Sequence, residues 1–238
     1  MADQFNRGVV LGRARTDAQI DEGLRAYMLR VYNYMVTGLA LTGAVAYIVA
    51  STPTVFNAIF GTGLQWIVIL APLGMVFFLS ARINKMSAAS AQIAYWVFAG
   101  LMGLSLASIF VIYTGESIAR VFFITAATFA AMSLYGYTTK RDLTKLGSFL
   151  FMGLIGIIIA MVVNAFIGST MIQFVISVLG VLIFVGLTAY DTQKIKEMYN
   201  EIDGSEIAGK KAIMGALRLY LDFINLFLML LHLFGNRN

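Results

Sequence analysis

The chain has 238 residues, of which 60% are hydrophobic and 12% are charged, and its mean hydropathy is +0.83. A soluble domain of this size needs more polar surface, so the composition predicts a polytopic membrane protein built as a single domain. With no cysteine, disulfides, thiolate metal sites and cysteine catalysis are excluded. The net charge of +5 does not indicate nucleic-acid binding, because the basic residues lie in short segments between hydrophobic stretches.

Residues 1–26 are expected to form a cytoplasmic N-terminal tail. This segment mixes basic and acidic side chains and lacks the apolar core and small-residue cleavage site of a signal peptide. A mitochondrial presequence is the alternative, since it too is rich in arginine. Four acidic residues, Asp3, Asp17, Asp21 and Glu22, disfavour that interpretation. Residues 27–238 then form one transmembrane domain.

Seven hydrophobic stretches follow the tail, and each has about the 17–25 residues that a helix needs to cross a bilayer. The sequence therefore predicts an all-α membrane protein, a bundle of seven transmembrane helices. The predicted spans are Tyr27–Ala50, Leu64–Ser80, Ala88–Tyr113, Val121–Tyr137, Leu146–Ile167, Met171–Tyr190 and Ile213–Leu233.

The charges of the loops predict the orientation of the bundle. If the N-terminus is cytoplasmic, every basic residue of the chain except Arg120, Arg218 and Arg237 falls on the cytoplasmic side. Such an excess of Lys and Arg is typical of cytoplasmic loops. We therefore expect an integral membrane protein with a cytoplasmic N-terminus and, after seven crossings, a C-terminus outside.

Charged residues inside the last span mark the candidate site. Arg218 and Asp222 interrupt the apolar run Ile213–Leu233. A charged residue at the centre of a span costs about 2.5–3.5 kcal/mol, so such residues normally face the bundle interior or a water-filled cavity. The best partner for Asp222 is Asp191, at the cytoplasmic end of the preceding span. Two carboxylates held close together in a low-dielectric bundle titrate as a coupled pair.

The position of Arg218 leaves two alternatives open. Because it precedes Asp222 by one helical turn, its side chain can neutralise that carboxylate, or it can extend to the cytoplasmic headgroups. Depth raises a second question. Asp191 is expected near the inner interface and Asp222 about 13 Å from Ile213, so they meet only if the sixth helix is tilted or begins further out.

Several enzyme classes are disfavoured by what the chain lacks. His232 is the only histidine, so a histidine-based zinc or serine protease site is absent, and no nucleotide-binding motif is present. An intramembrane protease with paired aspartates remains an alternative for Asp191 and Asp222. In such proteases a glycine precedes the second aspartate, whereas Leu221 stands there in this chain. We expect no enzyme activity and no cofactor.

Two blocks in the last third of the chain carry a family resemblance. GLTAYDTQKIKEMY and LYLDFINLFLMLLHLFG, behind five hydrophobic spans and a basic tail, resemble the bacterial branch of the transmembrane Bax inhibitor motif (Bax inhibitor-1) family. The resemblance implies a bundle with the last helix central and a pH-sensitive calcium leak across the bacterial inner membrane. It also implies that Asp191 and Asp222 form the pH sensor and that Arg82 latches onto them in the closed form.

The resulting expectation is a calcium or cation leak channel whose partners are the lipid bilayer, Ca²⁺ and protons. Two carboxylates with a few carbonyls and waters form a weak, transient Ca²⁺ site, as a path that must release the ion requires. The alternative is a regulatory membrane protein that transports nothing and modulates a membrane-bound ATP-dependent protease. The tail distinguishes them, because recruitment by a protease needs it and a channel does not.

Overall fold

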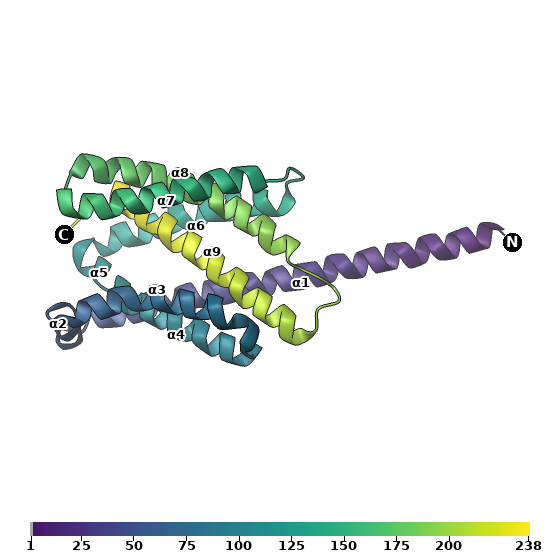
Figure 1. Ribbon diagram of the computed structural model, residues 1–238, viewed down its shortest axis with the longest axis horizontal. Coiled ribbons are helices and arrows are strands. Elements are labelled where there is room, and N and C mark those ends of the chain that lie inside the picture. Colours follow the sequence, from purple (N-terminus) through teal and green to yellow (C-terminus); the bar gives the residue numbers. More distant parts are fainter. Residues whose placement is uncertain (1) are drawn as a thin grey trace.

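The computed structural model describes the backbone of residues 2–238 and the side chains of residues 22–238. Figure 1 shows an all-helical molecule. Within residues 2–238 there is no strand, and one isolated antiparallel bridge joins Tyr113 and Arg237. The helices are α1 (Ala2–Ala50), α2 (Pro53–Phe60), α3 (Leu64–Arg82), the 3-10 turn η1 (Ile83–Lys85), α4 (Ala88–Leu106), α5 (Ile109–Ile112), α6 (Gly115–Thr138), α7 (Thr144–Ile167), α8 (Thr170–Glu197) and α9 (Ser205–Phe234).

Seven of the described segments are long and apolar enough to cross a membrane, as the sequence predicts. The all-α seven-helix class is confirmed, and the chain is an integral membrane protein. Several spans differ from the prediction. Helix α6 begins at Gly115, six residues before Val121, and the predicted span Ala88–Tyr113 is interrupted after Leu106 and continues as the short helix α5. Helix α8 continues past Tyr190 to Glu197, and α9 begins at Ser205, eight residues before Ile213. Both extensions are polar, because hydropathy locates the part of a helix that lies in lipid and not the part that leaves it.

The long helices pack as two groups. Helix α4 packs against α1 and α3, and helix α8 packs against α6 and α7. Helix α9 contacts both groups, through α1 and α4 on one side and through α6 and α8 on the other. In Figure 1 it crosses the molecule obliquely between them.

Helix α9 is the most buried of the seven. In its most apolar window 72% of residues are buried, against 17–28% in the other six spans. Position explains this burial and hydrophobicity does not, since α9 packs against α1, α4, α6 and α8, whereas the more apolar window of α7 is only 17% buried. Asp222 is among the buried residues of α9, whereas Arg218 is exposed.

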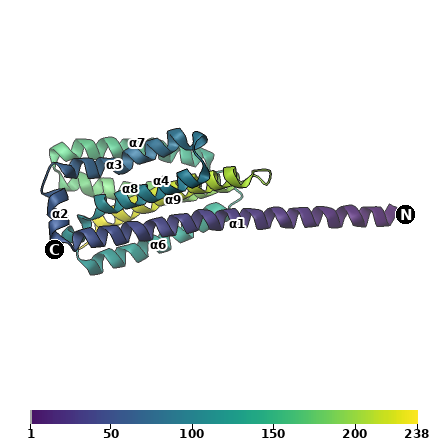
Figure 2. The ribbon, with the colours of Figure 1, turned by 90° about the horizontal axis from the view of Figure 1, so that it is seen from below.

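The two ends of the bundle differ. Helix α1 extends well beyond the other helices towards the N-terminus (Figure 2). The predicted tail, residues 1–26, lies within α1 except for residue 1, and its side chains up to residue 21 are outside the described part. At the opposite end the C-terminal residues bind the turn before α6, where Thr114 N donates to Asn236 O (3.0 Å) and Asn238 N donates to Ile112 O (3.0 Å).

Candidate functional site

A pocket of about 590 Å³ lies between α7, α8 and α9. Its polar side chains come from α8 and α9: Tyr190, Asp191, Arg218, Asp222 and Asn225. Helix α7 contributes only apolar side chains to it, among them Ile157 and Met161. The pocket thus has one wall that carries charge and one that does not.

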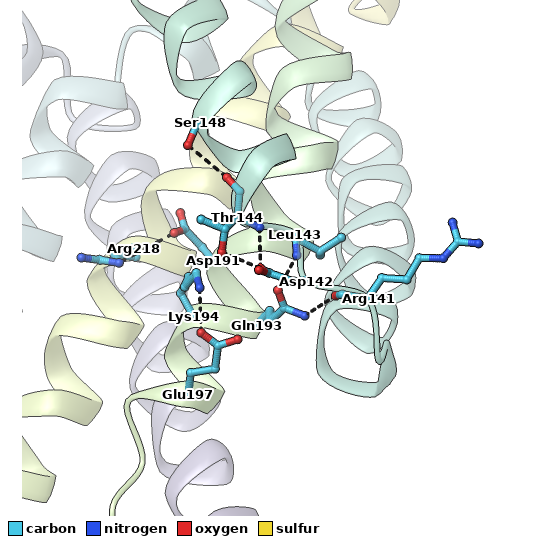
Figure 3. A network of polar contacts seen from close by, with 10 residues as sticks. All are labelled: Arg141, Asp142, Leu143, Thr144, Ser148, Asp191, Gln193, Lys194, Glu197 and Arg218. Carbon is cyan, nitrogen blue, oxygen red and sulfur yellow. Dashed lines mark hydrogen bonds and ion pairs between the residues drawn. The ribbon is translucent and has the colours of Figure 1, made fainter.

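An ion pair joins the two helices at the pocket. Arg218 Nη1 of α9 lies 3.8 Å from Asp191 Oδ1 of α8, and Figure 3 shows the two side chains pointing toward each other. The Arg218 side chain is 50% exposed and that of Asp191 is 18% exposed. The sequence leaves two alternatives for Arg218, neutralising Asp222 or reaching the headgroups. The structure shows a third arrangement, in which the guanidinium pairs with Asp191 and stays half exposed.

Asp222 is the buried member of the site. Its residue is only 5% exposed, and its Oδ2 atom has no hydrogen-bond partner. Its residue lines the same pocket as Asp191. Two carboxyl groups held close together in surroundings of low polarity titrate as a pair, so this is a place where protonation changes the charge of the pocket. A buried oxygen without a partner is costly, and it marks where a cation or water would be stabilised.

The depth difference between the two aspartates disappears in the structure. Because α8 runs to Glu197, Asp191 lies nearly two turns inside its helix, and α9 begins early enough to bring Asp222 beside it. The structure thus brings the two sequence-predicted aspartates together.

Asn225 is a polar residue of the pocket that the sequence reasoning missed. Arg218, Asp222 and Asn225 follow one another at spacings of four and three, so they share one face of α9. Asn225 Nδ2 donates to Leu221 O (2.8 Å), which leaves its Oδ1 as an acceptor in the pocket. The i, i+4, i+7 spacing of polar residues in an apolar helix was the available signal.

Consecutive residues of the YDTQ block fix α8 in place. The Tyr190 ring packs where Gly147 of α7 has no side chain, since a Cβ there would lie 2.4 Å from the ring. Asp191 faces Arg218, and Thr192 accepts from Ser133 of α6 (2.9 Å), which in turn accepts from Tyr32 of α1 (2.5 Å). Each residue of the block contacts a different element.

Gln193, the last residue of the block, clamps the loop between α6 and α7. Its Oε1 accepts from Leu143 N (2.9 Å) and its Nε2 donates to Arg141 O (2.8 Å), as Figure 3 shows. In the same loop Asp142 accepts from the backbone N of Thr144 (2.9 Å) and from its hydroxyl (2.5 Å). These bonds from Thr144 lower the pKa of Asp142 below its ordinary value. The loop holds the start of α7 against α8, next to Asp191.

The opposite face of α9 is also tied by polar bonds. Thr42 of α1 donates to Ala99 O of α4 (2.8 Å) and therefore accepts from the Tyr220 hydroxyl of α9 (2.7 Å). Both Thr42 and Tyr220 are buried. Helix α9 is thus fixed on one side by Tyr220, while its other face carries Arg218 and Asp222, two residues before and two residues after Tyr220, to the pocket.

The remaining sequence-predicted residues lie elsewhere. Arg82 is exposed at the end of α3, and within residues 22–238 no ion pair involves it, so its part as a latch stays a prediction. His232 is exposed near the end of α9, away from the pocket. Among the described side chains no group of three or more His, Cys, Asp or Glu could hold a metal. Any cation would bind to the two aspartates, the Asn225 amide oxygen and water.

These features define the class of the protein. It is a helical membrane protein with an ionisable site, two carboxyl groups and an arginine, between the last two helices of its transmembrane domain. The chain belongs to the family described as inhibitor of apoptosis-promoting Bax1, whose model matches residues 24–238. The matched region contains every residue of the pocket and all seven spans, apart from the first two residues of the first span.

Bacterial relatives match the chain over nearly its whole length. An uncharacterized protein of Rickettsia prowazekii is 52% identical over 91% of this chain and 92% of its own. The inner membrane protein YbhL of Escherichia coli is 48% identical over 94% of this chain and 97% of its own. An uncharacterized membrane protein of Streptococcus pyogenes serotype M3 is 36% identical over 92% of this chain and 96% of its own.

Proposed function

We propose that the chain is a pH-sensitive leak channel for calcium or a similar cation in the bacterial inner membrane, gated by the carboxyl pair Asp191 and Asp222. The observation that carries the proposal is the buried carboxyl group of Asp222, which has one oxygen without a hydrogen-bond partner and belongs to a residue that lines a pocket between transmembrane helices. The name of the Escherichia coli relative supports the choice of membrane.

The pocket suits a cation that binds and leaves. Asp191, Asp222 and the Asn225 amide supply at most five oxygens, whereas Ca²⁺ takes 6–8, so water completes the shell. Arg218 already neutralises part of the negative charge. A site so composed binds a cation weakly, and weak binding is what conduction requires.

The conformation described is a closed one in this proposal. Beyond Asp222 the pocket is lined by Ile157, Met161 and Met229, which are apolar. An apolar constriction excludes water and stops ions without a physical plug. The Arg218–Asp191 ion pair holds α9 to α8 on the other side of the pocket.

Protons act through that ion pair. When both carboxyl groups are charged, they attract the guanidinium strongly and keep the two helices together. When the pair takes up a proton, the attraction weakens, so α8 and α9 separate more easily. The expected sign is an increase of cation flux as pH falls.

Flux into liposomes that contain only the purified protein tests the proposal. Ca²⁺ entry is followed with a trapped dye between pH 8 and pH 5 for the parent, Asp191→Asn, Asp222→Asn and the control Asp142→Asn. The parent and the control should show flux that rises as pH falls, and the two pocket variants should lose this dependence. Unchanged pH dependence in both pocket variants overturns the gate, and no flux from the parent overturns the channel in favour of the regulatory alternative.

A further inference from the structure

A second concave feature lies on the other side of the bundle, between α1 and α6. It is an apolar groove of about 720 Å³ whose floor is formed by Phe223 of α9. A smaller hollow of about 90 Å³ continues it and shares Leu39, Phe122 and Phe223 with it. Figure 2 shows α1 and α6 as neighbours along the same side of the molecule.

The groove arises from regular positions on two helices. On α1 its wall includes Arg25, Tyr32 and Leu39, which are seven residues apart and therefore lie on one face. On α6 the small residues Ala126 and Ala130 hollow out the opposite wall. No side chain of the chain's described part fills the space between these walls.

The length of the groove matches one acyl chain. Arg25 and Leu39 are 14 positions apart, which is about 21 Å of helix rise. One leaflet of hydrocarbon is about 15 Å thick, half of the bilayer core. A chain that begins at the level of Arg25 can therefore lie in the groove along the whole depth of its leaflet.

Charge distinguishes this groove from other apolar surface. Arg25 stands at one end of it, and near that end Lys196 Nζ lies 5.0 Å from the centre of the Tyr137 ring, which lines the groove. The apolar groove between α7 and α8, of about 570 Å³, has no charged residue in its lining. A basic end joined to an apolar trough complements a phosphate joined to an acyl chain.

We propose that the groove between α1 and α6 is a binding site for an anionic phospholipid, with the phosphate at Arg25 and one acyl chain along α6. The site is independent of the proposed channel activity. It stands on the geometry of the groove and on the charge at its end.

Binding is tested on the purified full-length protein in detergent, with phosphatidylglycerol and phosphatidylcholine of equal chain length as probes. Native mass spectrometry counts the bound lipids, and thermal unfolding measures the stabilisation. Phosphatidylglycerol should bind more tightly than phosphatidylcholine. Arg25→Gln should weaken phosphatidylglycerol binding about fivefold, because one basic residue near a membrane surface contributes about 1 kcal/mol. Arg30→Gln, an exposed position on α1 outside the groove, should leave binding unchanged.

A second pair of variants tests the acyl position. Ala126→Trp fills the groove and should remove the bound lipid, whereas Ala127→Trp, next to it on the exposed face of α6, should not. Ala130→Met serves as a milder filling variant if Ala126→Trp does not fold. Equal binding in the groove variants and their controls overturns the proposal, as does equal affinity for the two lipids. If the parent has the mass of a dimer, and Ala126→Trp has the mass of a monomer but keeps its lipid, the proposal is overturned. The groove would then bind a second copy of the chain.

Discussion

Arg218 Nη1 and Asp191 Oδ1 lie 3.8 Å apart across the interface of α8 and α9, while Asp222, four residues from Arg218 on the same helix, keeps an unpaired oxygen. The arginine therefore neutralises the more exposed carboxylate and leaves the buried one facing the pocket. In the proposed channel this division gives the two aspartates different tasks. Asp191 would help to hold α8 and α9 together, and Asp222 would be the group that a cation meets.

The first prediction follows from that ion pair. Arg218→Gln should raise Ca²⁺ flux at neutral pH by about fivefold, since a half-exposed ion pair contributes about 1 kcal/mol at most to the closed state. Arg218→Lys should stay near the parent because it keeps the charge. Arg82→Gln is the decisive comparison in the same liposome assay. If Arg82→Gln raises flux and Arg218→Gln does not, the latch is Arg82.

Gln193 gives a prediction about stability. Gln193→Leu removes both hydrogen bonds to the α6–α7 loop and leaves the backbone N–H of the buried Leu143 without its acceptor. The expected loss is about 1–3 kcal/mol of unfolding free energy. Thermal unfolding in detergent measures it, with Gln92→Leu on α4 as a matched control. A melting temperature unchanged from the parent would show that the loop bonds are replaced by water at no cost.

The sequence and the structure agree most closely where hydropathy alone decides the outcome. Seven apolar runs of sufficient length predict seven spans, because the bilayer sets the length of each. The predicted sixth span ends at Tyr190, where a polar segment begins with Asp191, yet the chain continues as helix to Glu197. Helical structure and immersion in lipid are separate properties, and hydropathy reports only the second.

The site was harder to anticipate in detail than in position. Two aspartates in apolar surroundings can be found from the cost of burying charge. The ion-pair partner of Arg218 cannot be found in this way. Helical spacing places Arg218 beside Asp222, and only the crossing of α8 over α9 brings Asp191 closer to the guanidinium. Gln193 was missed since it is uncharged and stands at a helix end, where polar residues are ordinary.

The orientation of the bundle is tested by reporter fusions. A reporter that is active only in the periplasm should be active when fused after Asn238. It should be silent when inserted in the α8–α9 loop, residues 200–204, because the basic residues gather at the end of the bundle that carries this loop. A cytoplasm-active reporter at the same two positions should give the opposite pattern. Activity of the periplasmic reporter in the loop would invert the model and place Arg25 and the lipid groove in the outer leaflet.

Asp142 provides a pH dependence with a definite sign. Its pKa is lowered in the folded chain, chiefly by the bond from the Thr144 hydroxyl, so its charged form stabilises the fold above its ordinary pKa of 3.8. This stability is lost as pH falls through the lowered value. Asp142→Ala should therefore melt earlier than the parent near pH 7, and the difference should shrink in more acidic solution. Asp142→Asn keeps an acceptor for Thr144 N and should fall between them. A difference that stays constant down to pH 3 would show that the charge of Asp142 has no part.

The last prediction separates a functional role of Asp222 from a structural one. Asp222→Asn replaces a carboxylate that a cation can bind by a neutral amide of nearly the same shape, so Ca²⁺ flux at low pH should fall at least tenfold, equivalent to about 1.4 kcal/mol. The same change removes a charge from a site that is only 5% exposed and has an unpartnered oxygen. Burying a neutral group costs less than burying a charged one, so the melting temperature should stay level or rise.

His232→Ala, at an exposed position of the same helix, should change flux by less than about twofold, because it removes no group from the pocket. Flux and melting temperature are measured on the same preparations. If both fall together in Asp222→Asn, the carboxylate serves the fold, and the path for the cation lies elsewhere.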